Sequence, residues 1–153
     1  MEKQDTSTKE MLFTGPHQIR LKRWISSAPF EKLLGINITA AENGTAVLTM
    51  PFVESLAQGG GLMHGGAIVT LADTAVAMAI KSKLPPDSRF GTISINAEFL
   101  KPVIKGTLTA RAETRFLKNR QVKGTSVVHD EEENRIMAFT AMFKLARDVD
   151  IPV

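Results

Sequence analysis

The sequence contains no cysteine, no long run of apolar residues and no large excess of charge of either sign. The absence of cysteine excludes a disulfide scaffold, a thiolate metal site and a cysteine nucleophile. No stretch reaches the roughly 18 uninterrupted apolar residues that a transmembrane helix needs. A net charge of +3 over 153 residues favours an anionic small molecule, but it is too small and scattered to indicate nucleic-acid binding. We therefore expect neither a membrane nor a nucleic acid as a partner.

The rest of the composition is that of an ordinary globular protein, with 43% hydrophobic and 23% charged residues. The chain is long enough for one domain with a sizeable core. Its first residues, MEKQDTSTKE, are polar and of mixed charge and are not typical of a secretory signal, so we expect a cytoplasmic location. We predict an N-terminal arm and a short helix over residues 1–28, the helix running from His17 to Ala28, and a single domain over residues 29–153.

Alternation of apolar and polar residues predicts strands on both sides of one long helix. The turn residues Asn43 and Gly44 join the first two strands in a hairpin. The predicted strands cover residues 36–40, 45–50, 92–100, 107–117, 121–129 and 135–145. In the strand over 92–100, the alternation separates an apolar face, Ile93, Ile95, Ala97 and Phe99, from a polar face, Thr92, Ser94, Asn96 and Glu98. The order of elements indicates an α+β fold in which a curved antiparallel β-sheet wraps around one long central helix.

The predicted helix follows a glycine-rich turn and is apolar on every side. Between Gly65 and Ile80 its only charged residue is Asp73. A helix that is hydrophobic all round belongs in a core. Because an unpaired carboxylate there costs several kcal/mol, we expect Asp73 to be paired, hydrogen-bonded or used in chemistry.

The start of this helix has the properties of an oxyanion site. The first N–H groups of a helix lack intrahelical partners, and Gly65 and Gly66 leave those donors uncovered by side chains. The alternative is that these glycines serve only a tight turn or close packing. His64 immediately precedes the helix, and a capping role for its imidazole is the alternative to a catalytic one. His17 and His129 lie at no metal-ligand spacing, so no metal is expected.

Asp73 and the helix start are too far apart to act together within one chain. Asp73 lies eight residues after Gly65, which is about 12 Å along a helix axis. If the two groups cooperate, they belong to different subunits with antiparallel helices side by side. One helix also leaves part of a large sheet uncovered, so we expect a dimer with two sites at its interface.

Several familiar catalytic signatures are missing. The sequence has no G-x-S-x-G elbow of a serine hydrolase. Its glycine cluster lacks the lysine of a P-loop and does not lie in a βαβ unit with an acidic residue downstream, so neither nucleotide-binding fold is indicated.

With these residues in view, the chain resembles the hotdog-fold acyl-CoA thioesterases of the phenylacetic-acid-degradation type. The resemblance runs from about residue 30 to 145. Its core is His64-Gly65-Gly66 followed by Leu71-Ala72-Asp73, and the supporting segments are 28–36, APFEKLLGI, and 96–102, NAEFLKP. The resemblance implies hydrolysis of the thioester of a small aromatic or a short- or medium-chain acyl-CoA. It implies no cofactor, since coenzyme A is part of the substrate, and a homotetramer built as a dimer of dimers.

The resemblance also assigns roles to individual residues. Asp73 acts as general base on water or as nucleophile on the thioester carbonyl, and the Gly65 N–H binds the carbonyl oxygen. Gln58 stands where the family commonly has asparagine and helps position the water or the carbonyl. Thr92 supports the attacking water, with Ser94 as second choice. The remaining candidates for binding substrate or coenzyme A are Gly66, Ser94, Asn96, Lys118, Arg120 and Lys123, and a merely solvated turn is the alternative for the three cations.

Two other functions remain open from the sequence. One is a hotdog enoyl-CoA hydratase or dehydratase in which His64 and Asp73 form an acid–base pair across subunits. The other is an acyl-CoA-binding protein without catalysis. The acyl group itself depends on the packing of Met63, Met78 and Phe90 and on the partner subunit, which periodicity does not supply.

Overall fold

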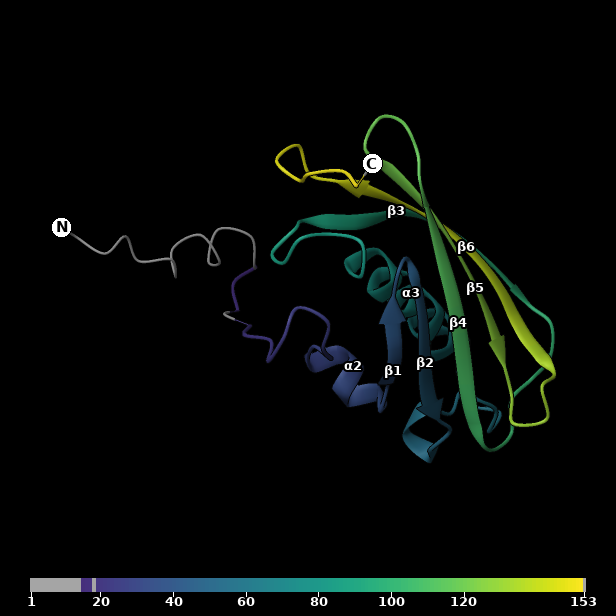
Figure 1. The fold of residues 1–153 in the computed structure, drawn as a ribbon. Helices are drawn as coiled ribbons and strands as arrows, with labels where there is room; N and C mark the ends of the chain where they lie inside the picture. Colours follow the sequence, from purple (N-terminus) through teal and green to yellow (C-terminus); the bar gives the residue numbers. More distant parts are fainter. Residues whose placement is uncertain (1–14, 18, 153) are drawn as a thin grey trace.

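The computed structural model describes residues 15–17 and 19–152. Within these described residues, two helices, one short 3₁₀ helix and six strands follow one another, and Figure 1 shows their arrangement. They are α2 (Pro29–Leu34), β1 (Asn37–Glu42), β2 (Thr45–Pro51), η1 (Glu54–Leu56), α3 (Gly65–Lys81), β3 (Phe90–Phe99), β4 (Thr107–Phe116), β5 (Gln121–His129) and β6 (Arg135–Leu145). This confirms the α+β fold and every predicted strand, with bounds that differ from the predicted ones by a residue or two.

The six strands form one antiparallel sheet in the order β1-β2-β4-β5-β6-β3. The sheet is curved, and α3 lies against its concave face (Figure 1). The hairpin between β1 and β2 turns at Asn43 and Gly44, whose φ angles of 50° and 80° are those of the expected left-handed turn. β1 and β3 are the two edge strands, and β3 is largely exposed.

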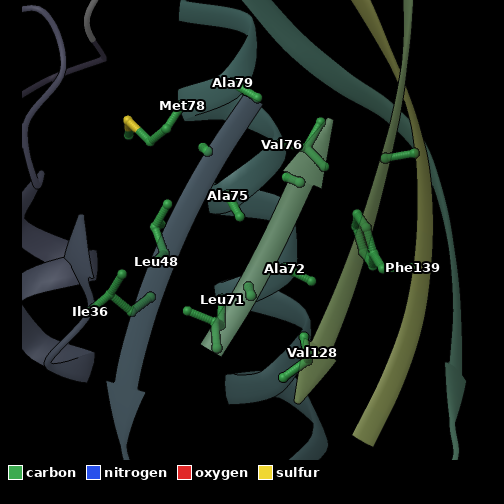
Figure 2. Packing of buried hydrophobic residues seen from close by; sticks show 14 of the residues in the cluster. Ile36, Leu48, Leu71, Ala72, Ala75, Val76, Met78, Ala79, Val128 and Phe139 are labelled. Atoms are coloured by element: carbon green, nitrogen blue, oxygen red, sulfur yellow. The ribbon is translucent and has the colours of Figure 1, made fainter. Parts of the chain in front are cut away.

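The central helix packs closely against the inner face of the sheet (Figure 2). Leu71, Ala72, Ala75 and Val76 are fully buried there. A Cβ built on Gly124 of β5 would lie 2.1 Å from Cγ1 of Val76, so the glycine allows the helix its close approach. The close approach of α3 to β5 therefore depends on the absence of a side chain at Gly124.

The other side of α3 is less buried than its sequence suggests. Val69, Thr70, Asp73 and Ala77 form a stripe at helical spacing, and all four are only partly buried. The expectation of a helix buried all round is therefore wrong for the single chain. Together with α2 and the edge strand β3, this stripe lines a hollow.

The helix predicted from His17 to Ala28 is absent from the described residues, which form bends at 22–26. Side chains bond the backbone here in place of helical hydrogen bonds: Ser26 Oγ donates to the carbonyl oxygen of Arg23 at 2.8 Å. The following proline, at the first position of α2, further disfavours helical geometry at Ala28, which is extended. Most of the predicted N-terminal arm lies outside the described residues.

The segment before α2 instead contacts the C-terminal end of α3 through Trp24. Trp24 Nε1 donates to the carbonyl oxygen of Lys81 at 3.0 Å, and Lys81 Nζ donates to the carbonyl oxygen of Trp24 at 3.0 Å. The same ammonium lies 4.5 Å from the centroid of the indole ring, in cation–π contact. Burial lowers the pKa of Lys81, and the nearby Glu31 opposes that shift. We call these contacts between Trp24 and Lys81 the Trp24 clasp.

None of the described helices is long and apolar enough to cross a membrane.

Candidate active site

Asp73 is held by a hydrogen bond from the edge strand. The hydroxyl of Thr92 donates to both carboxylate oxygens of Asp73, at 3.2 and 3.3 Å. Burial raises the pKa of Asp73, and the hydrogen bond from Thr92 opposes that rise. A partly desolvated carboxylate is a stronger base than one in water, and a single hydroxyl partner leaves it further lone pairs for a water or a substrate.

Thr92 reaches Asp73 because β3 has a bulge. The register shifts between Thr92 and Ser94, so that Thr92 pairs with Phe143 while Ile95 pairs with Ala141. Residues paired across strands point to the same face, and Phe143 and Ala141 are buried on the helix side. Thr92 therefore shares a face with Ile95, Ala97 and Phe99, and the predicted alternation was wrong at this residue.

The pair opens into a hollow of about 540 Å³ between α2, α3 and β3. Its walls combine polar groups near Asp73 with apolar side chains from all three elements. It is lined by Phe30, Glu31, Val69, Thr70, Asp73, Thr74, Ala77, Thr92, Ile93, Ser94 and Ile95. Such a mixture of apolar surface and a few polar groups is typical of a small-molecule site.

The start of α3 provides one unused backbone donor. His64 is the N-cap, and its Nδ1 accepts a hydrogen bond from the Gly66 N–H at 2.8 Å. Its neighbour Gly65 has no acceptor for its N–H within the described part of the chain. The ring of Phe99 packs over Gly65, where an added Cβ would lie 3.1 Å from Phe99 Cε1. The helix start thus offers the Gly65 N–H, while the Gly66 N–H is occupied by the cap.

Not every predicted site residue joins this hollow. Gln58 lies in the loop before α3, and its side-chain carbonyl accepts from the Gly60 N–H. Ser94 lines the hollow, but Asn96 pairs with Thr140 on the sheet face turned away from α3. The predicted catalytic set is therefore divided between Asp73 with Thr92 in the hollow and the helix start with Gln58 and His64.

The three predicted phosphate-binding cations have different surroundings. The guanidinium of Arg120 donates to the carbonyl oxygens of Ala146 and Val149, and so holds the segment after β6 in place. Lys118 is exposed at the turn between β4 and β5. Lys123 pairs with Arg115 and Met142 on the outer face of the sheet. Only the two lysines are free to meet a phosphate, and neither lines the hollow.

The three residues named above for the depth of the pocket do not line this hollow. Met63 and Met78 are buried in the core, and Phe90 packs against Phe143 with ring centroids 6.0 Å apart. The apolar walls come instead from Phe30, Val69, Ala77, Ile93 and Ile95. Helical spacing from Asp73 could have indicated Val69 and Ala77, but no sequence signal links Phe30 to the helix.

A scan of protein families places the chain in a known class of enzymes. The Thioesterase superfamily model matches residues 60–137, which include the helix start, Asp73 and Thr92. The chain belongs to this superfamily, with the hotdog fold, and is a thioester hydrolase.

Individual relatives agree with this assignment. The acyl-coenzyme A thioesterase PaaI of Escherichia coli is 37% identical over 115 residues, covering 74% of this chain and 76% of that protein. The 1,4-dihydroxy-2-naphthoyl-CoA hydrolase of Listeria monocytogenes is 31% identical over 104 residues, covering 67% and 85%. The solved structure of E. coli PaaI superposes with a TM-score of 0.69 at 28% identity, over 76% of this chain and 83% of that one. A conserved Pseudomonas aeruginosa protein shares the fold with a TM-score of 0.76 at 20% identity, over 83% and 100%.

Proposed function

We propose that the chain hydrolyses acyl-CoA thioesters with small aromatic or short- or medium-chain acyl groups, using Asp73 as the general base on water or as the nucleophile. The observation that carries the proposal is the Asp73–Thr92 pair at the wall of an open, mainly apolar hollow. Acyl-CoA hydrolases among the relatives support coenzyme A as the carrier of the acyl group.

In this mechanism the carboxylate of Asp73 takes a proton from water as the water oxygen attacks the thioester carbonyl. The Thr92 hydroxyl keeps the carboxylate oriented toward the hollow. As the tetrahedral intermediate collapses, the carbon–sulfur bond breaks, the proton held by Asp73 passes to the sulfur, and coenzyme A leaves as the free thiol. If Asp73 is instead the nucleophile, its oxygen bonds to the acyl carbon as the carbon–sulfur bond breaks and coenzyme A leaves as the thiolate. Water then cleaves the resulting acyl anhydride, which restores the carboxylate and releases the acid. Either route needs a donor for the developing oxyanion.

The Gly65 N–H of a second copy supplies that donor in our proposal. About 12 Å of helix separate Gly65 from Asp73 in one chain, so the donor and the base of one site come from two chains. The exposed edge of β3, with Ile93, Ile95 and Phe99 partly uncovered, provides a surface on which a second copy can pair. A two-fold axis there sets the two helices antiparallel, and each dimer then has two sites. Further pairing of dimers gives the tetramer.

The role of the Gly65 N–H as oxyanion donor can be tested without changing the charge of any residue. Gly65 is the first residue of α3, a position that tolerates proline, and His64 before it has ψ 130°, which a following proline allows. Gly65→Pro removes the N–H, while Gly65→Ala adds a Cβ but keeps it. We expect Gly65→Pro to lower kcat about 10²- to 10³-fold and Gly65→Ala to lower it much less. Equal losses would show that the N–H is not used.

Mixing inactive subunits tests whether the site is shared. A chain with Asp73→Asn still offers Gly65, and a chain with Gly65→Pro still offers Asp73. In a mixed dimer one of the two sites then has both intact groups. Co-expression of the two variants should therefore restore activity that neither has alone. No recovery from purified mixed dimers would place both groups of a site in one chain.

Hydrolysis and hydration differ in what they require of His64. Its Nδ1 is engaged as the cap of α3, which is the alternative role foreseen from the sequence. An enoyl-CoA hydratase would need this imidazole for proton transfer, which its Nε2 remains available to provide, so the cap does not decide between the two reactions. Following the absorbance of an enoyl-CoA distinguishes the two reactions, because hydration removes the conjugated double bond and hydrolysis does not.

A further inference from the structure

A short helix that the catalytic mechanism does not use forms the outer wall of the hollow. α2 spans only Pro29–Leu34 and contains no buried residue. Two of its large apolar side chains are exposed, Phe30 by 56% and Leu33 by 77%. Phe30 lines the hollow beside Asp73, whereas Leu33 does not.

The backbone of α2 is held in place by hydrogen bonds at its end and by the segment before it. Gly35 ends the helix with φ 72°, and its N–H donates to the carbonyl oxygens of Glu31 and Lys32. Beyond it, the Ile36 N–H donates to the Glu31 carbonyl at 2.9 Å. On the other side, the Trp24 clasp fastens the preceding segment to the end of α3. The wall therefore has a defined position relative to Asp73.

The chemistry of the wall suits an acyl group. Phe30 brings an aromatic face to the hollow, and Val69, Ala77 and Ile95 bring aliphatic surface from the opposite elements. In the proposed mechanism the thioester carbonyl lies at Asp73, and the mainly apolar walls of the hollow favour the acyl group over the charged coenzyme on this side of the carbonyl. The ring of Phe30 then occupies space that a longer or bulkier acyl group would need.

We propose that Phe30 is a specificity-determining residue, and that its ring on α2 limits the size of the acyl group that the site accepts. This inference rests on the proposed thioesterase function. It assigns no part in the bond-breaking steps to Phe30, so the residue acts on the choice of substrate and leaves the chemistry to Asp73.

The test compares variants at Phe30 with a matched change on the same helix. Phe30→Ala removes the ring, Phe30→Leu removes part of it, and Leu33→Ala shortens a more exposed side chain outside the hollow. For each protein, kcat/KM is measured for a series of linear acyl-CoAs of increasing length and for acyl-CoAs with one and two aromatic rings. The quantity compared is the ratio of kcat/KM for a long or bulky acyl-CoA to kcat/KM for a short one. The fraction of active protein cancels in this ratio.

We expect the ratio to rise about tenfold or more in Phe30→Ala, since each methylene accommodated in an apolar pocket changes selectivity by roughly 10- to 200-fold. Phe30→Leu should be intermediate and Leu33→Ala unchanged. An unchanged ratio in Phe30→Ala, or the same rise in Leu33→Ala, would overturn the inference. A change only in oligomeric state, with an unchanged ratio, would make Phe30 a subunit contact and would overturn it too.

A binding measurement separates this inference from the proposed function. Asp73→Asn keeps the hollow but removes the carboxylate, so affinities for the same acyl-CoAs can be measured by calorimetry without turnover. If the wild-type chain hydrolyses no acyl-CoA, the proposed function fails. The inference still stands if Phe30→Ala in the Asp73→Asn background shifts affinity toward the larger acyl groups. It is refuted if the order of affinities is unchanged or if no acyl-CoA binds.

Discussion

Replacing Gly124 by alanine should push the central helix away from the sheet and disturb the site. The new Cβ would lie 2.1 Å from Cγ1 of Val76, 3.0 Å from Cγ2 and 3.1 Å from Cβ. A different rotamer of Val76 moves its methyl groups but not its Cβ, so the 3.1 Å contact with that Cβ remains and still requires a shift of the backbone. α3 must withdraw, and Asp73, one turn earlier on the helix, withdraws with it from Thr92.

The size of the effect can be worked out from the same contact. Overpacking a close-packed core typically costs about 1–3 kcal/mol, and we expect Gly124→Ala to cost about 3 kcal/mol, since both methyl groups and the Cβ of Val76 are too near. Val76→Ala alone leaves a cavity at a fully buried site and should cost about 2 kcal/mol. In the double variant the methyl groups that clash are gone. We therefore expect about 2–3 kcal/mol for the pair, well below the sum of about 5 kcal/mol.

Urea unfolding of the four proteins measures these free energies, and kcat/KM measured on the folded proteins reports on the site. Gly124→Ala should lose activity in the native state, and Val76→Ala should restore part of it. Additive free energies within about 0.5 kcal/mol would refute the reasoning, because they would mean that the two side chains do not compete for the same space.

Three further changes test the site and the clasp. Thr92→Val removes a hydrogen bond that lowers the pKa of Asp73, so the acidic limb of the pH–kcat/KM profile should move to higher pH. Thr92→Ser keeps the hydroxyl and should leave the profile unchanged. Identical profiles for Thr92→Val and the wild type would contradict this role of Thr92. Burial raises the pKa of Asp73, so its ionisation lowers stability as pH rises from the unfolded pKa, about 4, through the higher folded pKa. Asp73→Asn should therefore have the higher Tm at pH 7. This gain should shrink as pH drops through the folded pKa and be absent below about 4, whereas a gain independent of pH would contradict it. Trp24→Phe keeps a ring over Lys81 but loses the indole N–H, and it should lower the free energy of unfolding by about 1 kcal/mol. An unchanged free energy of unfolding would mean that this hydrogen bond contributes nothing to stability.

The architecture was predictable because its signals are local. The alternation in the strands and the left-handed turn at Asn43 and Gly44 needed no knowledge of distant residues. The helix start at Gly65 was marked by the glycines and by His64 before them. A charged residue alone in an apolar helix likewise singled out Asp73, whatever the helix packs against.

The features that were missed depend on contacts between distant parts of the chain. The bulge at Ile93 turns Thr92 toward the helix, and strict alternation cannot show an inserted residue. The stretch before Pro29 has helical spacing, but its tryptophan bonds to the end of α3 instead. Phe30 is placed beside Asp73 only by the folding of α2 over the hollow. Propensity and periodicity describe one secondary-structure element at a time. Each of these three features depends on how two elements pack against each other, so the sequence pattern could not predict it.

The most direct test of the central claim follows free thiol while the purified wild-type protein and Asp73→Asn are incubated with aromatic, short-chain and medium-chain acyl-CoAs. We expect thiol release by the wild type and a loss of at least about 10²-fold in the variant, with the same oligomeric state for both proteins. Undiminished release by Asp73→Asn, or no release by the folded wild type from any acyl-CoA, would contradict it.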